Sequence, residues 1–162
     1  DSLPLPLRLF RNIVGLFPSF PIRFAIKSGT FQKLAPKTLA AYAAPFPSIK
    51  YKGGAKAFPK LLPTTSTDPG AQRMKKAREV LSRWEKPALV LFSDKDPVLS
   101  SYQDFFFDLI PSSAQQEKIT IKNAGHFLQE DKGEEIARLI DKFIQGALEV
   151  PRESQPVNKI LS

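Results

Sequence analysis

Two short apolar runs separated by a segment of helix length constrain the fold of this chain most strongly. The runs cover residues 88–92 and 118–121, and residues 101–109 between them have a helical pattern. Because both runs are continuously apolar rather than alternating, they predict parallel strands that are buried on both faces. The sequence therefore predicts an α/β fold that contains a βαβ unit.

A carboxylate and the chain's single histidine follow these two runs. Asp96 comes shortly after the first run, and His126 shortly after the second. Since neighbouring parallel strands end at the same edge of a sheet, we expect the two side chains to meet. A buried carboxylate bonded to one imidazole nitrogen leaves the other nitrogen as a general base. We predict Asp96 and His126 as catalytic residues, acid and base respectively.

Structural explanations for these residues stay open. Asp94 and Asp96 precede a proline and can cap a turn by accepting bonds from nearby amides. A lone histidine in a loop can also be structural. Glu130 and Asp131 lie close to the histidine, but one histidine and no cysteine give no reason to expect a metal site. We predict no metal and no cofactor, and interpret the two carboxylates as favouring the start of the last helix.

Composition narrows the classes of protein to which the chain can belong. Hydrophobic residues make up 42% and charged residues 25% of the 162 residues, as in folded soluble domains. No apolar run approaches the roughly 18 residues that cross a bilayer, so we expect no membrane span. The net charge of +8 raises the question of nucleic acid, but the basic residues are scattered. We predict no nucleic-acid partner, and the compartment, cytoplasm or organelle, stays open.

The chain divides into three parts by composition. Residues 1–70 are rich in proline and aromatic residues, and short helices expected at 35–42 and 51–62 make this part a helical lid. Residues 71–148 hold the βα units, and residues 149–162 are expected to form an extended tail.

Two amphipathic helices are predicted to flank the strands. The first spans residues 71–84, and its apolar stripe consists of Ala71, Met74, Ala77, Leu81 and Trp84. The second spans residues 133–148, and its buried face consists of Ile136, Leu139, Ile140, Phe143 and Ile144. The aromatic residues at 105–107 also lie on more than one helix face, which predicts burial against a surface that this chain lacks.

Several motifs resemble those of the haloalkane dehalogenases, within the α/β-hydrolase superfamily. They are Ala44-Pro45-Phe46-Pro47, Phe92-Ser93-Asp94-Lys95-Asp96-Pro97 and Ala124-Gly125-His126-Phe127. The similarity extends over roughly residues 1–147. It implies the C-terminal part of an α/β-hydrolase fold, a helical cap followed by two parallel strands with flanking helices. It also implies that Asp96 is the triad acid and His126 the base that activates water.

The resemblance also defines what the 162 residues do not contain. Such enzymes carry an aspartate nucleophile upstream of the cap, with an oxyanion hole and a halide-binding tryptophan, and we find none of these. Phe10 stands where some members have a cap tryptophan, and phenylalanine supplies no N–H donor. Phe10, Phe46 and Phe58 are predicted to line a pocket for an apolar small-molecule substrate, although aromatic residues in a lid can equally serve packing.

Two functions follow from these observations. In the first, the chain is the C-terminal half of a haloalkane dehalogenase-like hydrolase, which supplies acid, base and lid. It is inactive without a complementary N-terminal half. In the alternative, the chain is a catalytically inert structural subunit, derived from a hydrolase, that binds other protein subunits in a larger assembly, for example in an organelle.

Overall fold

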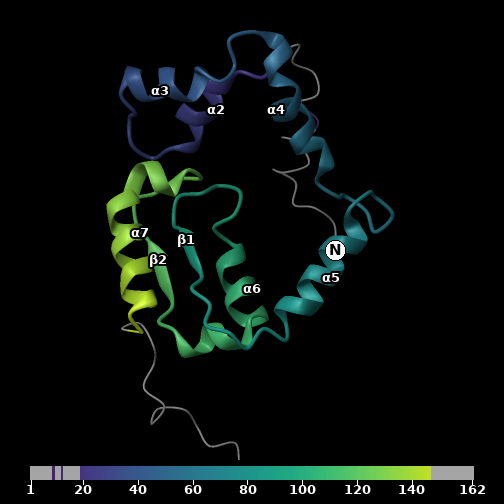
Figure 1. Ribbon diagram of the computed structural model, residues 1–162, viewed down its shortest axis with the longest axis vertical. Helices are drawn as coiled ribbons and strands as arrows, with labels where there is room; N and C mark the ends of the chain where they lie inside the picture. The colour runs from purple at the N-terminus through teal and green to yellow at the C-terminus, as the bar shows by residue number, and fades with distance from the viewer. Residues whose placement is uncertain (1–8, 10–11, 13–18, 147–162) are drawn as a thin grey trace, which may run out of the picture.

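The computed structural model describes Leu9, Asn12 and residues 19–146. Phe10 and the tail expected at residues 149–162 lie outside the described residues. Figure 1 shows α2 (Ile22–Gly29) and α3 (Pro36–Ala43) beside the start of α7 (Leu128–Ile144). Helices α4 (Gly53–Ala57) and α5 (Ala71–Leu81) follow a separate path on the other side of the molecule before the chain enters the sheet.

The part of the chain that the sequence predicts to be a lid, for which we keep that name, consists of short helical pieces. They are α2 (Ile22–Gly29), α3 (Pro36–Ala43), the 3₁₀ turn η1 (Ile49–Lys52), α4 (Gly53–Ala57) and the 3₁₀ turn η2 (Phe58–Leu61). The helix expected at 35–42 is confirmed as α3, with its proline in the first turn, where a missing N–H costs nothing. The single helix expected at 51–62 is wrong, because Gly53, Gly54 and Pro59 weaken a continuous helix and three short turns form instead.

The βαβ unit is confirmed. Strand β1 (Leu91–Ser93) pairs in parallel with β2 (Ile119–Ile121), and helix α6 (Tyr102–Leu109) lies between them in the chain, followed by the 3₁₀ turn η3 (Pro111–Gln115). Ser93 pairs with Ile121, so the two strands end level with each other. This register places the loops that follow the strands side by side.

The core lies around the two strands and α6. Ile121 is fully buried, and Val90 and Ile110 are buried nearby. The ring of Phe106 on α6 stacks on that of Phe92 on β1, with 6.0 Å between centroids. Gln103 on α6 is also buried, and its side-chain amide donates to the carbonyl of Ile119 at 2.6 Å. Helix α6 is thus fixed to both strands.

The two flanking helices bury less than their sequences predict. Helix α5 (Ala71–Leu81) has no buried residue, and of its expected stripe Met74, Ala77 and Trp84 are exposed. On α7 (Leu128–Ile144), Ile140 and Ile144 are 44% and 75% exposed. The expected burial was wrong for these residues, because a sheet of two strands offers too little surface to cover an apolar helix face.

Helix α7 begins earlier than expected. It starts at Leu128, and its non-helical residue Lys132 (φ −141°, ψ 33°) makes a kink between a short first segment and the longer remainder. The expected start at Gly133 corresponds to the segment after this kink. Among the helices that the structure describes, none is long and apolar enough to cross a membrane.

Core packing at Ile121 leads to a testable prediction. We expect Ile121→Val to lower the free energy of unfolding by about 0.5–1.5 kcal/mol, because the lost methylene leaves a cavity beside β1. Ile144→Val makes the same chemical change at an exposed site and is expected to change it by less than about 0.5 kcal/mol. Urea unfolding of the two variants measures both. Equal destabilisation by the two changes would contradict this core.

Candidate active site

Backbone pairing continues past the ends of the two strands. The N–H of Asp94 donates to the carbonyl of Ile121, and the N–H of Lys95 to that of Ala124, both at 3.0 Å. The Ser93 hydroxyl, at the end of β1, donates to the carbonyl of Gly125 at 2.7 Å. The loop after β1 is therefore held against residues 124–127, which we call the histidine loop.

Asp96 and His126 meet at this edge of the sheet, as the sequence predicts. The Nδ1 atom of His126 lies 2.9 Å from Oδ2 of Asp96. The other carboxylate oxygen, Oδ1, accepts the backbone N–H of Val98 at 2.8 Å. Asp96 thus also caps the turn, as the structural explanation predicts, and one carboxylate makes both contacts.

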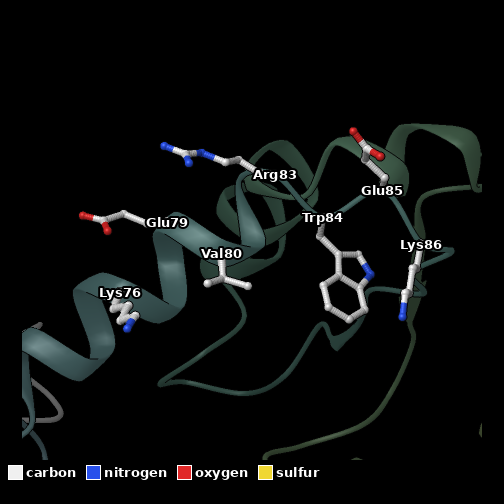
Figure 2. Close-up of a pocket in the computed structure, with 7 residues that line it drawn as sticks. All are labelled: Lys76, Glu79, Val80, Arg83, Trp84, Glu85 and Lys86. Carbon is white, nitrogen blue, oxygen red and sulfur yellow. The ribbon is translucent and has the colours of Figure 1, made fainter.

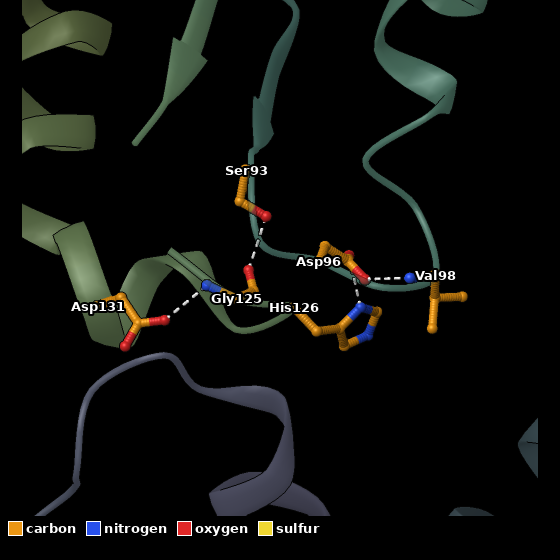
Figure 3. A network of polar contacts seen from close by, with 6 residues as sticks. All are labelled: Ser93, Asp96, Val98, Gly125, His126 and Asp131. Atoms are coloured by element: carbon orange, nitrogen blue, oxygen red, sulfur yellow. Dashed lines mark hydrogen bonds and ion pairs between the residues drawn. The ribbon is translucent and has the colours of Figure 1, made fainter. Parts of the chain in front are cut away.

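The environments of the two side chains differ in a way that suits acid–base chemistry. Asp96 is 5% exposed, whereas the side chain of His126 is 41% exposed. Figure 3 shows the imidazole turned with one nitrogen toward Asp96 and the other away from it. With Nδ1–H donating to the carboxylate, Nε2 keeps its lone pair free to take a proton. This geometry can orient and support a general base.

Asp131, at the start of α7, makes contacts beyond the helix start that the sequence predicts for it. Its buried carboxylate accepts three backbone N–H groups, each at 2.8 Å, from Phe31, Gln32 and Gly125. The position near the start of a helix was expected, but these partners all lie outside the helix. Only the fold brings residues 31 and 32 to this place, so no local pattern could reveal the contacts.

The histidine loop also touches the end of α2 through backbone. The N–H of Phe127 donates to the carbonyl of Gly29 at 2.9 Å. A Cβ at Gly125 would lie 2.7 Å from the same carbonyl oxygen, and one at Gly29 would lie 2.5 Å from the ring of Phe127. Both positions therefore require glycine for close approach.

A hydrogen bond between side chains also joins the lid to α7. The hydroxyl of Tyr42 on α3 donates to Oε1 of Glu130 at 2.5 Å. This bond to a carboxylate, together with partial burial, raises the pKa of Tyr42 above its ordinary value of 10.0. Within the described residues there is no group of three or more His, Cys, Asp or Glu side chains that could hold a metal ion.

The aromatic residues predicted to bind substrate are not gathered in one place. Phe46 lines a hollow between α2 and α3, together with Ile22, Phe24 and Lys52. Phe58 is 73% exposed on η2 and does not line that hollow, and neither do Asp96 and His126. Phe10 lies outside the described residues.

A second hollow lies at the C-terminal end of α5. Figure 2 shows it lined by an indole, an aliphatic side chain and five charged side chains: Lys76, Glu79, Val80, Arg83, Trp84, Glu85 and Lys86. The ammonium of Lys86 lies 5.8 Å from the centre of the Trp84 ring. Neither Asp96 nor His126 borders this hollow, so it forms no part of the candidate active site.

Relatives of known name match most of this chain. It is 46% identical over 127 residues to a haloalkane dehalogenase of Psychrobacter cryohalolentis, a match that covers 78% of this chain and 42% of the relative. It is 41% identical over 139 residues to one from Mycolicibacterium paratuberculosis, covering 86% and 46%. The chain thus spans about half the length of the curated relatives it matches. No protein-family model matches it.

Solved structures give the same relationship. The haloalkane dehalogenase DpaA from Paraglaciecola agarilytica superposes with a TM-score of 0.75 at 25% identity, over 86% of this chain and 46% of that one. DatA from Agrobacterium tumefaciens, at 22% identity, shares the fold with a TM-score of 0.68 over 90% and 53%. The fold is the C-terminal part of an α/β-hydrolase fold. The chain is haloalkane dehalogenase-like and corresponds to the C-terminal half of such enzymes.

The close approach at Gly125 predicts a specific effect of adding one methyl group. We expect Gly125→Ala to separate the histidine loop from Gly29, because the new Cβ collides with a backbone carbonyl rather than with a movable side chain. Amide hydrogen exchange at Phe127, whose N–H donates to Gly29, is expected to accelerate by about tenfold or more.

Gly133→Ala is the matched control for this change. A Cβ at Gly133 meets nothing within 4 Å, and alanine favours a helix by up to about 1 kcal/mol. We expect unchanged exchange at Phe127 and equal or greater stability. If Gly125→Ala behaved in the same way, the close packing of the loop against Gly29 would be refuted.

The Tyr42 hydrogen bond predicts a pH dependence of stability. Because folding raises the pKa of Tyr42, the bond contributes fully below pH 10.0, and its contribution is lost as the pH rises through the higher pKa of the folded state. We expect Tyr42→Phe to lose about 1 kcal/mol at neutral pH and to remove this part of the alkaline loss. Denaturant unfolding at a series of pH values measures it.

Tyr51→Phe provides the comparison, since Tyr51 is 63% exposed. It is expected to leave both the stability at neutral pH and its alkaline dependence close to those of the unchanged chain. A Tyr42→Phe variant that kept the full alkaline loss would show that another group causes it.

Proposed function

We propose that this chain supplies the acid, the base and the lid of a haloalkane dehalogenase-like hydrolase, and that a complementary N-terminal half supplies the nucleophile. In this proposal Asp96 orients His126, and Nε2 of His126 activates the water that completes hydrolysis. In this proposal the chain alone is inactive, because it has an oriented base but no nucleophile to attack the substrate carbon.

The pair at the sheet edge is the observation that carries the proposal. A nearly buried carboxylate lies 2.9 Å from one imidazole nitrogen, and the half-exposed ring presents its other nitrogen outward. In the proposed reaction this nitrogen takes a proton from water, and Asp96 stabilises the imidazolium that results.

Exposed apolar side chains favour the view that further strands and helices, supplied by a partner, pack against this chain. These exposed side chains occur on three helices: Met74 and Val80 on α5, Phe105 on α6, and Ile140 and Ile144 on α7. Exposed apolar area of this kind is typical of an interface with another part of a fold. A half that adds strands beside β1 and β2 would bury it and provide the elbow that carries a nucleophile.

We assign the lid to residues 1–70 and the βα units to residues 71–148 in this proposal. The substrate is an apolar small molecule that lies between lid and sheet, and Phe46, in the hollow between α2 and α3, is the aromatic residue best supported as part of its surroundings. Phe10 and Phe58 are proposed to contribute only in the assembled hydrolase.

Complementation tests the proposal. The 162-residue chain is co-expressed with the N-terminal half of a haloalkane dehalogenase, and hydrolysis is measured with a chlorinated alkane, an epoxide and an aromatic ester as probes. We expect turnover only when both halves are present. Replacing His126 by alanine is expected to abolish it, and Asp96→Asn to reduce kcat by about 10²–10⁴-fold, since the imidazole loses its orienting charge.

Asp108→Asn is the control for the loss of a carboxylate, because Asp108 is exposed on α6 away from the strand ends. It is expected to retain full turnover. If the halves associate stably and no probe is hydrolysed, the chain is the inert structural subunit instead. Unchanged turnover in His126→Ala would refute the role of the histidine.

A further inference from the structure

The environment of Asp131 is unusual for an ionised group. The residue is 7% exposed, and a carboxylate removed from water is stable only when hydrogen bonds replace the lost hydration. Three backbone N–H groups provide them: Oδ2 accepts from Phe31 and Gly125, and Oδ1 accepts from Gln32. All three lie at 2.8 Å, the length of charge-assisted bonds. One carboxylate therefore fastens two segments of backbone that lie far apart in the sequence.

The two segments are joined to each other immediately before and immediately after His126. Gly125 directly precedes His126, and Phe127, which directly follows it, donates its N–H to Gly29 at 2.9 Å. Residues 29–32, which we call the lid segment, thus bond to the histidine loop on both sides of His126, once through Asp131 and once directly. Figure 3 shows Asp131 and Ser93 approaching Gly125 from opposite sides, with His126 projecting beyond it toward Asp96.

These hydrogen bonds restrain the direction of the imidazole. The backbone on either side of His126 cannot rotate while these bonds hold, so the Cα–Cβ direction of the histidine is fixed relative to the lid segment. Nδ1 then stays within hydrogen-bond distance of Asp96, although the side chain is 41% exposed. The ring also meets that of Phe127 edge-on, with 5.2 Å between centroids. The bonds to the backbone on either side of His126 add to these two restraints.

We propose that Asp131 is a positioning residue for His126, which couples the direction of the imidazole to the position of the lid segment. This inference rests on the proposed function, because the direction of the imidazole affects catalysis only if His126 acts as the base. Asp131 touches no reacting atom; it acts through Gly125 and the lid segment.

Asp131→Asn tests the proposal with almost no change in size. An amide has one acceptor oxygen, so at least one of the three N–H groups faces an NH₂ donor and loses its bond. The backbone carbonyl of Asp131, which accepts from the Gln32 side chain at 3.0 Å, is retained and keeps the segments near each other. Asp131→Ala removes all three side-chain bonds, so the effect is expected to grow from Asn to Ala.

Nuclear magnetic resonance of the full 162-residue chain gives a readout that does not depend on turnover. Because the chain has one histidine, the signal of the ring Nδ1 proton belongs to His126 without ambiguity. In Asp131→Asn we expect this proton to exchange with water at least about tenfold faster, and the amides of Phe31, Gln32 or Gly125 to lose protection in parallel. The amide of Asp94, bonded to Ile121, is expected to keep its protection.

Asp141→Asn is the matched control, since Asp141 lies on the same helix, is exposed and bonds the side chain of Gln145. It should change none of these signals. An unaltered ring proton in both Asp131 variants would overturn the proposal. So would an equal loss of protection at Asp94 and throughout the sheet, because it would show that Asp131 only stabilises the fold.

Turnover in the complemented hydrolase separates this proposal from the proposed function. We expect Asp131→Asn to lower kcat by about tenfold with little change in KM, because the base is misdirected while the substrate surroundings persist. If the two halves give no turnover even with the unchanged chain, the proposed function fails. The resonance experiment still decides whether Asp131 directs the imidazole.

Discussion

The parallel pairing of β1 with β2 is the interaction on which the rest of this structure depends. The register brings Ser93 level with Ile121, and two further backbone bonds extend the pairing into the loops beyond. Everything at the candidate active site follows from that alignment. A shift of one residue in register would reverse which side chains face the core, and Asp96 and His126 would no longer meet.

A buried carboxylate then connects this sheet edge to the lid. Asp131 replaces its lost hydration with three backbone N–H groups, and hydrogen bonds to a charged group are typically worth about 1.5–3 kcal/mol each. Glu130, its neighbour, holds Tyr42 of α3. The first turn of α7 is therefore the place where lid, histidine loop and sheet are joined, and the two glycines that permit the close approach, Gly29 and Gly125, lie at the same junction.

The sequence predicts the structure where the determining contacts are local or periodic. Continuous apolar runs predicted the two parallel strands, and strand geometry alone predicted that Asp96 and His126 would meet. The prediction failed for the apolar faces of α5 and α7, where periodicity indicates that a face is to be buried but not whether this chain supplies the covering surface. The same limit explains Asp131: its partners at residues 31 and 32 are distant in sequence, and backbone N–H groups leave no mark on residue identity.

The proposed function requires that Asp96 hold the imidazole of His126 in the form that can act as a base. Nitrogen-15 spectroscopy of the ring of the one histidine measures this most directly, because the two ring nitrogens give different signals when one carries the proton. In the neutral ring we expect the proton on Nδ1, directed at Asp96, and none on Nε2. A proton found on Nε2, with Nδ1 bare, would contradict this expectation.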